Sequence, residues 1–583
     1  MKTTSLSRDT SRSIKSPKRH DERIILHFDY DCFYASVFEN EDPSLKTQAL
    51  GVKQKSILAT CNYVARARGV RKLMLISEAQ RVCPDLILAN GEDLTRFRDV
   101  SKRLWTFLRA HAWGDRVERL GLDEVFLDVT AIVSYNRELL NAGALRDSFF
   151  QLDRNDPVRG FAFDGSRFHG CVEPAIMGEA VEVDVADPLC VRLMLASHLA
   201  GYLRRKLDED FGYTSSGGIA TSKLLAKLAG SVNKPNNQTT LLLRTNGQAD
   251  GVAEAFMDAH SLRKVPGIGS RTAQLIEEYL LSRPTKHRDH EGGVTVGEVR
   301  QHPGISPELL DQILDRPGTE RGSGDKVWNL LHGVDPSEVK EASDVPTQIS
   351  IEDTYMTRPL QTQVDILREL RALATSLIRR MRVDLTSAST QPPRWLAHPR
   401  TLRLSTRTKP KSSTSEAQNY ARSSRSMPLP NFVFQLAPSS AEEIAERLVT
   451  EALLPLFRRL HPERNGGWNI ALLNVCVANM AVAAAVGDTK MGVVGVPGRD
   501  IGRMFRTQEQ KLREWTVYES PPAERVDGDR GVVDGDLSVD SSSTPDVDDE
   551  VWEESDSQCC PVCGHGIPAF AMAAHERFHA MGE

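Results

Sequence analysis

The chain has 583 residues, 40% of them hydrophobic and 26% charged, which is typical of a soluble globular protein with three or four domains. No stretch is long and apolar enough to span a membrane, and no apolar secretory segment stands near Met1, so we expect neither a membrane protein nor a secreted one. The net charge of −6 is uneven, because residues 521–558 hold 13 acidic residues and two arginines and leave residues 1–520 mildly basic. A basic body with an acidic tail is compatible with a nucleic-acid partner, although ordinary charge scatter gives the same sum.

The first half of the chain mixes strand and helix patterns. Residues 1–22 are rich in Ser, Lys and Arg, which predicts a disordered basic N-terminus and, at Lys15, Lys18 and Arg19, a nuclear import patch. From Ile24 an apolar strand is predicted to run into a helix. The later patterns predict a strand pair at 48–60, a short helix at 62–69 stopped by glycine, a helix at 93–112, a β-hairpin at 116–130 with a tight turn at Gly121–Leu122, a helix at 191–210, a strand at 214–220 and a helix at 222–229.

Residues 131–185 give no clear pattern. Because the strands and helices do not alternate as βαβ units, the fold class is predicted to be α+β. The second half is predicted to be helical at 251–340, and then to contain strands at 400–407 and 468–480 around helices at 361–383 and 440–460. Residues 483–558 are rich in Gly, Asp and Ser and predict a flexible acidic linker, followed by a separate small unit at 559–583.

Three acidic residues are candidates for chemistry because they stand on apolar strands. Asp29 ends the strand IILHFD, and the pair Asp123–Glu124 lies inside LGLDEVFLD. Carboxylates in such positions are costly unless they are paired or bind cations. Phosphoryl-transfer sites hold two divalent ions about 3.5–4 Å apart with hard oxygen ligands, and one strand plus a neighbouring hairpin can supply them. Ordinary surface acids at strand ends would look the same, so the spacing alone leaves both interpretations open.

A family resemblance runs through the whole region from Ile24 to Met480. Six segments occur in order: FDYDCFYASV, LGVKQKSILATCNYVARARGV, NGEDLTRFR, VERLGLDEVFLDVT, SKLLAKLAGSVNKP and VPGIG. Together they resemble the Y-family translesion DNA polymerases, and within that family the iota branch. The resemblance implies a right-hand polymerase. Its expected parts are a palm at 23–33 and 94–250, fingers at 34–93, a thumb with a helix-hairpin-helix at 251–344 and a little finger at 345–482.

The resemblance also implies a catalytic role for each carboxylate. Asp29 and Glu124 would ligate Mg²⁺, or alternatively Mn²⁺, with Asp123 as the third carboxylate. The backbone carbonyl of Tyr30 would complete the nucleotide-side metal. Tyr34 matches the steric gate that excludes a ribose 2′-hydroxyl, although it could equally be a core tyrosine.

The incoming dNTP would be held by its phosphates. Tyr63 and Arg66 are three residues apart in a helical segment, hence on one face, and the family uses this pair on the β- and γ-phosphates. Lys234, in the NKP turn, matches the family's triphosphate lysine. Asp31 is expected to be structural. Two further lysines are predicted to face solvent: Lys223 and Lys227.

The segment that implies the iota branch lies in the fingers. Gln54, Lys55 and Ile57 are bulky, and in the iota branch such side chains press on the template base so that adenine turns syn and pairs through its Hoogsteen edge. Ser56 and Ala59 are smaller than the usual iota residues. An eta- or kappa-type bypass polymerase, and a non-catalytic scaffold that binds DNA and ubiquitin, remain the alternatives.

Two further segments are predicted to hold primer-template DNA. VPGIGSRTA reads as a helix–turn–helix in which Gly267 and Gly269 let backbone amides approach a phosphate. Residues 394–425 hold eight Lys or Arg and one Glu, and alternation puts Arg403 with Ser405 on one face of a strand. Arg403 and Arg407 would contact duplex phosphates, unless this basic run is simply a solvated face.

The C-terminal unit has the spacing of a zinc site. Of the nine cysteines six are scattered, which argues against a disulfide framework, and three crowd into the last 25 residues. The predicted Zn²⁺ ligands of a small ββα-type finger are Cys560, Cys563, His575 and His579. The finger resembles the ubiquitin-binding fingers of translesion polymerases, although Arg577 stands where those carry Asp; a weak DNA-reading finger is the alternative.

The remaining expectations concern partners and location. Residues 498–505 and 509–518 each loosely resemble a sliding-clamp motif. The implied partners are therefore primer-template DNA, dNTP, a sliding clamp and ubiquitin, for a monomeric enzyme of the nucleus.

Overall fold

The computed structural model describes residues 17–482, apart from several gaps, and residues 557–559 and 566–568. The gaps are at 20, 175–181, 244–250, 283–292, 316–320, 356–357, 388–393, 410–421, 437–438 and 463–466. The chain divides into two compact units, Met1–Gly498 and Arg499–Glu583. In the second unit the described residues form a short antiparallel hairpin of β16 (Ser557–Cys559) and β17 (Gly566–Pro568). All four predicted zinc ligands, and the predicted linker except for its last two residues, lie outside the described residues.

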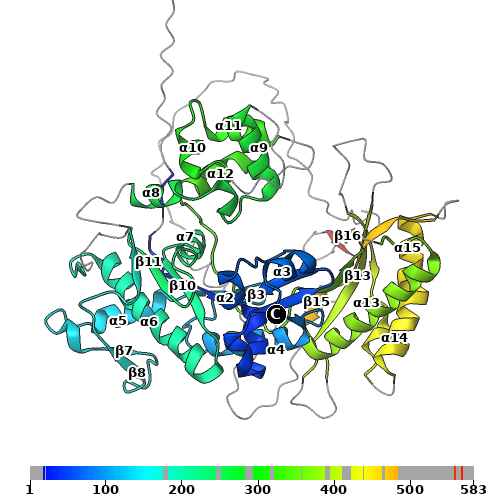
Figure 1. The fold of residues 1–583 in the computed structure, drawn as a ribbon, viewed down its shortest axis with the longest axis horizontal. Helices are drawn as coiled ribbons and strands as arrows, with labels where there is room; N and C mark the ends of the chain where they lie inside the picture. The colour runs from blue at the N-terminus through cyan, green and yellow to red at the C-terminus, as the bar shows by residue number, and fades with distance from the viewer. Residues whose placement is uncertain are drawn as a thin grey trace, which may run out of the picture. The chain divides into compact units, whose positions relative to one another are not determined.

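A six-stranded mixed sheet in the order β5–β6–β1–β10–β11–β9 carries the candidate carboxylates. Two of its strands, β10 and β11, are labelled in Figure 1. Its strands are β1 (Ile25–Tyr30), β5 (Val117–Leu120), β6 (Glu124–Asp128), β9 (Cys171–Glu173), β10 (Ser215–Ala220) and β11 (Gln238–Leu241). The apolar β1 is almost wholly buried because it lies between β6 and β10 and runs antiparallel to both. The predicted hairpin at 116–130 is confirmed as β5 and β6, and Gly121 takes φ +79° in the turn, a left-handed value that favours glycine.

Helices α6 (Pro188–Phe211) and α7 (Lys223–Ala229) pack against this sheet. The long α6 contacts β10 and β11, and α7 contacts β1, β10 and β11. Ser222 caps α7 by accepting a hydrogen bond from the Leu225 amide. A Cβ at Gly218 of β10 would lie 1.9 Å from the carbonyl oxygen of Ala226, so a glycine is required for α7 to lie this close.

The stretch 131–185, which has no clear sequence pattern, contains regular structure. Helix α5 (Thr130–Leu139) packs on α6 and is followed by a hairpin of β7 (Ser148–Gln151) and β8 (Gly160–Phe163). The buried amide of Asn136 joins them, since it donates to the carbonyl of Gln151 and accepts from the amide of Gln151.

A three-stranded sheet in the order β3–β2–β4 has its own small core. Its elements are β2 (Leu50–Gln54), β3 (Ile57–Cys61), α2 (Tyr63–Ala67), α3 (Ile76–Val82) and β4 (Ile87–Asn90). Helix α1 (Phe33–Glu41) precedes them, and its buried residues belong to the same core as the six-stranded sheet. The next helix, α4 (Thr95–Arg109), returns to the six-stranded sheet at β5 and β6. The predicted short helix stopped by glycine is α2, which Asn62 caps; Gly69 follows it with φ +91°.

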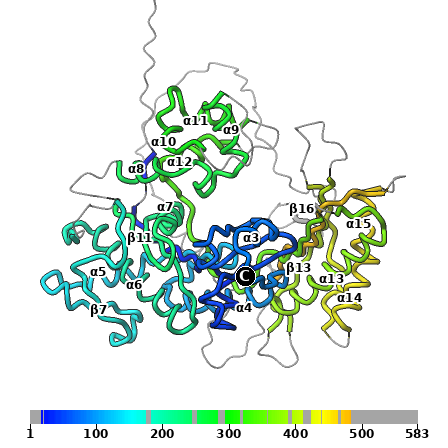
Figure 2. Tube along the Cα trace, viewed as in Figure 1, coloured from blue at the N-terminus to red at the C-terminus, as the bar shows by residue number. Residues whose placement is uncertain are grey.

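The predicted helical region is confirmed, as Figure 2 shows along the chain trace. Its helices are α8 (Val252–Asp258), α9 (Ser270–Leu281), α10 (Val296–Gln301), α11 (Pro307–Leu314) and α12 (Ser323–Leu331).

A four-stranded antiparallel sheet follows, in the order β12–β15–β13–β14. Its elements are β12 (Gln348–Thr354), α13 (Gln363–Asp384), β13 (Ala397–Thr408), β14 (Ser423–Pro428), α14 (Ala441–Leu448), α15 (Leu454–Leu460) and β15 (Ile470–Val482). One π-helical turn, Val449–Leu453, joins α14 to α15. The whole is a mixed α+β fold, as predicted. Within the described part of the chain, no helix is both long and apolar enough to cross a membrane.

Candidate functional site

Strand register brings the three predicted carboxylates together at one end of the six-stranded sheet. Asp29 of β1 is the direct antiparallel partner of Glu124 of β6. The amide of Tyr30 donates to the carbonyl oxygen of Asp123 at 2.9 Å, so Asp123 lies immediately beside this pair. Residues that are 94 and more positions apart in the sequence therefore form one acidic cluster.

Two lysines neutralise part of this cluster. The ammonium of Lys234 forms an ion pair with the carboxylate of Asp29, and Lys227 of α7 donates to Glu124 Oε2 at 2.7 Å. The prediction that Lys227 and Lys223 are solvated is wrong, because Lys223 likewise pairs with Glu118 Oε2 at 2.9 Å. The face of α7 that looks polar in sequence lies over the acidic residues of β5 and β6 rather than over water.

Asp123 shows the electrostatic strain of the cluster. Burial, together with the negative charges of Asp29 and Glu124, raises the pKa of Asp123 to about 6. A site that destabilises its own ionised carboxylate is stabilised by a bound cation, and carboxylate oxygens are the ligands that Mg²⁺ prefers. As the side chains stand in the described region, no three His, Cys, Asp or Glu residues are close enough together to hold a metal ion. The lysines take up the oxygens of Asp29 and Glu124 instead.

His27 is a member of the site that the sequence reasoning missed. It lies two residues before Asp29 on β1, hence on the same face, and its Nε2 is 3.7 Å from Glu124 Oε1. Burial, with the nearby charges of Lys227 and Lys234, holds the pKa of His27 well below its usual range, so the imidazole is neutral. The available signal was a polar residue inside an otherwise apolar strand.

Asp31 holds the turn that carries Lys234. Its carboxylate accepts from the Ser216 hydroxyl at 2.7 Å and from the backbone amide of Asn236 at 2.9 Å. These contacts agree with the structural role expected of Asp31, since they tie the end of β1 to the chain just after Lys234.

The two tyrosines and the arginine predicted to meet the nucleotide lie next to the cluster. Tyr34 of α1 stacks on Phe97 with ring centroids 4.2 Å apart, and after burial the charge of Asp123 is the largest influence that raises the Tyr34 pKa. Tyr63 and Arg66 share one face of α2, as predicted, with the guanidinium 4.7 Å from the ring centroid. Burial raises the pKa of Tyr63 to about 12, and Asp29 is among the charges that contribute.

The bulky finger residues make contacts within the protein. Lys55 lies in the turn between β2 and β3 with φ +53°, and its ammonium bonds the Asp353 carboxylate and the Thr354 carbonyl of the four-stranded sheet. Gln54 donates to the carbonyl of Gly91 at 2.8 Å. Ile57 begins β3 and forms an isolated bridge with Leu75.

The glycines predicted to approach DNA lie in a loop before a helix. Gly267 takes φ +93°, and Gly269 is the N-cap of α9. The expected helix–turn–helix is shorter than predicted in its first arm, because only a single 3-10 turn, Leu262–Lys264, precedes the loop. Gly267 and Gly269 therefore lie on elements other than β1 and β6, the strands that carry Asp29 and Glu124.

The predicted alternation along β13 is confirmed. Leu402 and Leu404 are fully buried in the core of the four-stranded sheet, whereas Arg403 and Arg407 are half-buried. Arg403 is opposite Ser426 on one side and Cys476 on the other. Both arginines therefore belong to the sheet face that points away from this core.

Sequence comparison identifies the family to which this arrangement belongs. Residues 28–231 match the impB/mucB/samB family, and residues 346–489 match the C-terminal domain of the same family. The chain belongs to the impB/mucB/samB family. The motifs had indicated a Y-family polymerase, and this family membership confirms that resemblance.

Relatives of the chain are named DNA polymerases. It is 30% identical to DNA polymerase iota of Homo sapiens over 472 residues, which cover 81% of this chain and 54% of the relative. It is 35% identical to DNA polymerase iota of Drosophila melanogaster over 376 residues, 64% of this chain and 43% of the relative. It is 28% identical to DNA polymerase IV of Mannheimia succiniciproducens over 341 residues, 58% of this chain and 71% of the relative. The chain spans about half the length of the iota relatives that it matches.

Proposed function

We propose that the chain is a DNA-directed DNA polymerase that inserts deoxynucleotides opposite damaged template bases with low fidelity. The observation that carries the proposal is the register that sets Asp29 opposite Glu124 with Asp123 beside them, in a chain whose relatives are named DNA polymerases. The alternative, a non-catalytic scaffold, gives no reason for three carboxylates to converge.

The proposed division of the chain into polymerase domains assigns each sheet, and the helical region, to a domain of its own. The six-stranded sheet and its helices would be the palm, at 23–33 and 94–250, and the three-stranded sheet the fingers, at 34–93. The helical region at 251–344 would be the thumb, and the four-stranded sheet at 345–482 the little finger. The separate cores of the three-stranded and four-stranded sheets support this division.

In the proposed reaction the primer 3′-hydroxyl attacks the α-phosphorus of the dNTP and pyrophosphate leaves. Asp29, Asp123 and Glu124, with the carbonyl of Tyr30, would hold two divalent ions, Mg²⁺ or Mn²⁺. Ions bound there would supply electrostatic stabilisation of the charge that develops on the attacking and leaving oxygens. The ammonium of Lys227 would keep the Glu124 carboxylate in place during the reaction.

The nucleotide would be recognised by its phosphates and its sugar. Lys234 would exchange Asp29 for the triphosphate, and Tyr63 and Arg66 would contact the β- and γ-phosphates from α2. The Tyr34 ring would fill the space of a 2′-hydroxyl, and its stacking on Phe97 supports a rigid gate.

The iota-type mechanism is the finer proposal. Identities with three polymerase iota relatives support it. Gln54, Lys55 and Ile57 would narrow the site around a template adenine, which requires Lys55 to exchange Asp353 for the template. Steady-state insertion of each dNTP opposite each template base tests this. More frequent misinsertion opposite template T than opposite template A would support the iota type. Equal misinsertion frequencies opposite T and A would support an eta or kappa type.

Duplex DNA would be held outside the palm. The backbone amides near Gly267 and Gly269 would meet a phosphate at the start of α9, and Arg403 and Arg407 would meet phosphates along β13. Binding should weaken steeply with salt.

The tail proposals rest on sequence motifs. Zn²⁺ would be bound by Cys560, Cys563, His575 and His579, and the finger folded around it would bind ubiquitin. One of the segments 498–505 and 509–518 would bind the sliding clamp. The enzyme would act as a monomer in the nucleus. Titrating the full chain with ubiquitin, against a Cys563→Ala control, tests the finger; identical titrations would reject it.

Primer extension is the decisive test of the main proposal. The variants Asp123→Ala and Glu124→Ala should abolish extension, because each removes an oxygen ligand that no neighbour can replace. Glu138→Gln, an exposed carboxylate on α5, is the matched control and should extend as the unaltered chain does. Extension that survives in both alanine variants would contradict the proposal, and no extension by the unaltered chain would favour the scaffold.

A further inference from the structure

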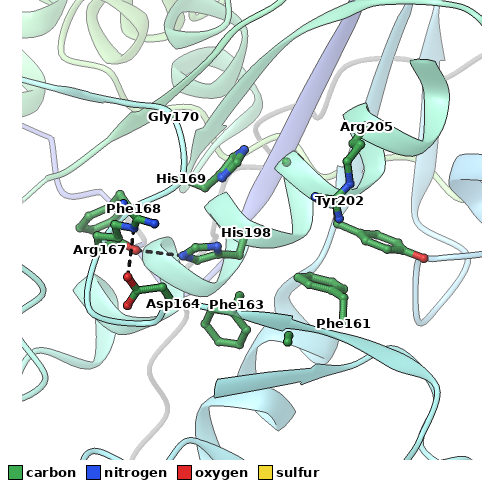
Figure 3. A pocket seen from close by; sticks show the side chains of 12 residues that line it. Phe161, Phe163, Asp164, Arg167, Phe168, His169, Gly170, His198, Tyr202 and Arg205 are labelled. Atoms are coloured by element: carbon green, nitrogen blue, oxygen red, sulfur yellow. Dashed lines mark hydrogen bonds and ion pairs between the residues drawn. The ribbon is translucent and has the colours of Figure 1, made fainter. Parts of the chain in front are cut away.

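A cavity of about 400 Å³ lies between the loop after β8 and one side of α6 (Figure 3). Its walls include Phe161 and Phe163 of β8, Arg167 and His169 of the loop, and His198, Tyr202 and Arg205 of α6. None of these residues belongs to the acidic cluster or to the set proposed to hold the nucleotide there. The cavity lies in the stretch whose pattern could not be interpreted from sequence, together with α6.

The loop that forms this cavity is fixed by hydrogen bonds before any ligand binds. The amide of His169 donates to the Ser197 hydroxyl at 2.9 Å, and the Gln238 side chain donates to the His169 carbonyl at 2.8 Å. His198, only 9% exposed, donates through Nε2 to the Arg167 carbonyl at 2.9 Å. A preformed cavity of this kind needs little ordering when a ligand enters.

A glycine lets the loop pack this closely on the helix. A Cβ at Gly201 would lie 2.2 Å from the His169 ring, so no other residue at this position leaves the imidazole where it is. The position of His169 at the cavity wall is therefore built into α6 rather than left to an unconstrained surface side chain.

The charge at the mouth of the cavity is mainly positive. Arg167 and Arg205 have largely exposed side chains; Arg167 pairs with Asp164 at 3.1 Å, and Arg205 pairs loosely with Glu209 at 3.9 Å. Burial lowers the pKa of His169, and the positive charges of Arg204, Arg205 and Arg167 lower it further, which reports a positive potential at this point. Each guanidinium has five N–H donors, so both retain donors for an anion beside their carboxylate partners.

Aromatic rings stand in the wall of the cavity beside its polar groups, and Phe161 stacks on both Tyr202 and Phe150. Phe161 and Tyr202 stack face to face with centroids 4.4 Å apart, and the rings of Phe163 and His198 lie 4.7 Å apart. A volume of about 400 Å³ is within the range of small-molecule sites, which combine apolar walls with a few polar groups. A ligand that matches both features carries a phosphate and an aromatic ring.

We propose that this cavity binds a nucleoside phosphate, with the phosphate at Arg167 and Arg205 and the base among the rings. The ligand is either a free nucleotide or the 5′-phosphorylated terminal nucleotide of a strand, because the two offer the same groups. This site is independent of the proposed polymerase reaction, and a chain without polymerase activity would still bind here.

Isothermal titration calorimetry of the full chain with dAMP in EDTA tests the site, because the chelator suppresses metal-dependent binding at the carboxylates. The variants Arg167→Ala and Arg205→Ala should each raise the dissociation constant at least about tenfold, as expected for the loss of a charge-assisted contact. Arg81→Ala, an exposed arginine on α3, should leave the dissociation constant unchanged. Circular dichroism checks that each variant is folded.

A second variant guards against loss of folding. Ala162→Trp adds a bulky ring at an exposed position of the cavity wall and should block dAMP without removing a positive charge. Absence of binding at millimolar dAMP, or equal binding by the unaltered chain and all cavity variants, would overturn the proposal. The strand-end source predicts that a 5′-phosphorylated hexanucleotide displaces dAMP better than its unphosphorylated counterpart; equal weak displacement by both identifies the free nucleotide.

Discussion

Lys227 and Lys234 contact the same acidic cluster from elements of different stiffness. Lys227 extends from α7, whose leucines are buried in the main core, so its position relative to Glu124 is fixed by packing. Lys234 lies in a turn held by Asp31 through the next residues of the chain. The helix lysine is therefore suited to hold a carboxylate permanently, and the turn lysine is suited to change partners.

Replacing Lys227 by Met should lower kcat at least about tenfold, because Glu124 loses a half-buried positive partner and is left near two like charges. The KM for dNTP should change much less, since Lys227 holds a carboxylate and not the nucleotide. Steady-state primer extension measures both constants.

Lys223→Met is the matched control, because it removes the neighbouring ion pair with Glu118 on the same helix. Equal losses of kcat in both variants would show that Lys227 has no special role in positioning Glu124.

The raised pKa of Asp123 predicts a pH effect on the metal-free protein. The folded pKa of about 6 exceeds the usual 3.8, so the protonated form is favoured by folding and stability falls as pH rises from about 4 to 6. Allowing for screening by solvent, the loss should be about 1–2 kcal/mol. Asp123→Asn should remove this dependence.

Chemical denaturation in EDTA at pH 4 and pH 7 measures the effect. The unfolding free energy of Asp123→Asn should exceed that of the unaltered chain at pH 7 and match it at pH 4. A variant that is less stable at pH 7 would contradict the assigned repulsion.

At the scale of elements, three helices end in the same way. His111, His260 and His332 follow α4, α8 and α12, and each ring Nδ1 donates to the carbonyl four residues earlier, at 2.8–2.9 Å. Each imidazole also contacts the aromatic ring of that earlier residue, with centroids 4.4–4.7 Å apart. A protonated histidine would be favoured at a helix C-terminus, yet burial lowers the pKa of all three, so desolvation exceeds the dipole effect.

These histidines predict that the fold weakens in mild acid. Because the folded pKa lies below the unfolded value near 6.5, their stabilisation is fully present above 6.5 and is lost progressively as pH falls from there through the folded pKa. Unfolding by urea measures the free energy of unfolding at pH 7 and at pH 5. Its decrease from pH 7 to pH 5 should be smaller in His332→Gln than in the unaltered chain. His398→Gln, on β13, is the control, and a drop in His332→Gln as large as in the control would reject the explanation.

Elements whose pattern is local could be predicted, whereas contacts between them could not. The β5–β6 hairpin follows from alternation and Gly121, and β1 follows from an apolar run that ends in Asp29. The partner of Lys227 depends on which side of α7 faces the sheet, which no local pattern fixes. Likewise, Lys55 meets a residue 298 positions away, and the buried amide of Asn136 joins the β7–β8 hairpin to α5.

At the scale of the whole molecule, the two larger hydrophobic cores are separate. One runs through residues 24–339 and contains the six-stranded sheet and the helical region. The other runs through residues 345–477 and belongs to the four-stranded sheet with α13, α14 and α15. Each core buries its own residues without side chains from the other, so unfolding of the chain is not expected to be two-state.

A fragment of residues 345–482 should therefore fold alone. It should give a cooperative thermal transition by circular dichroism, and calorimetry of the full chain should resolve more than one transition. The fragment 24–344 serves as the complementary control. If 345–482 shows no cooperative melting while the full chain melts in one step, the two cores depend on each other.

The pairing of β1 with β6 links the proposed polymerase activity to the integrity of the main core. A slip of one residue would turn Asp29 and Glu124 to opposite sides of the sheet, and the buried neighbours of these strands forbid it. Amide protons in β1 should exchange with solvent only when the entire sheet opens. Heat inactivation should thus coincide with melting of that sheet, since local fraying at the edges leaves the acidic pair intact.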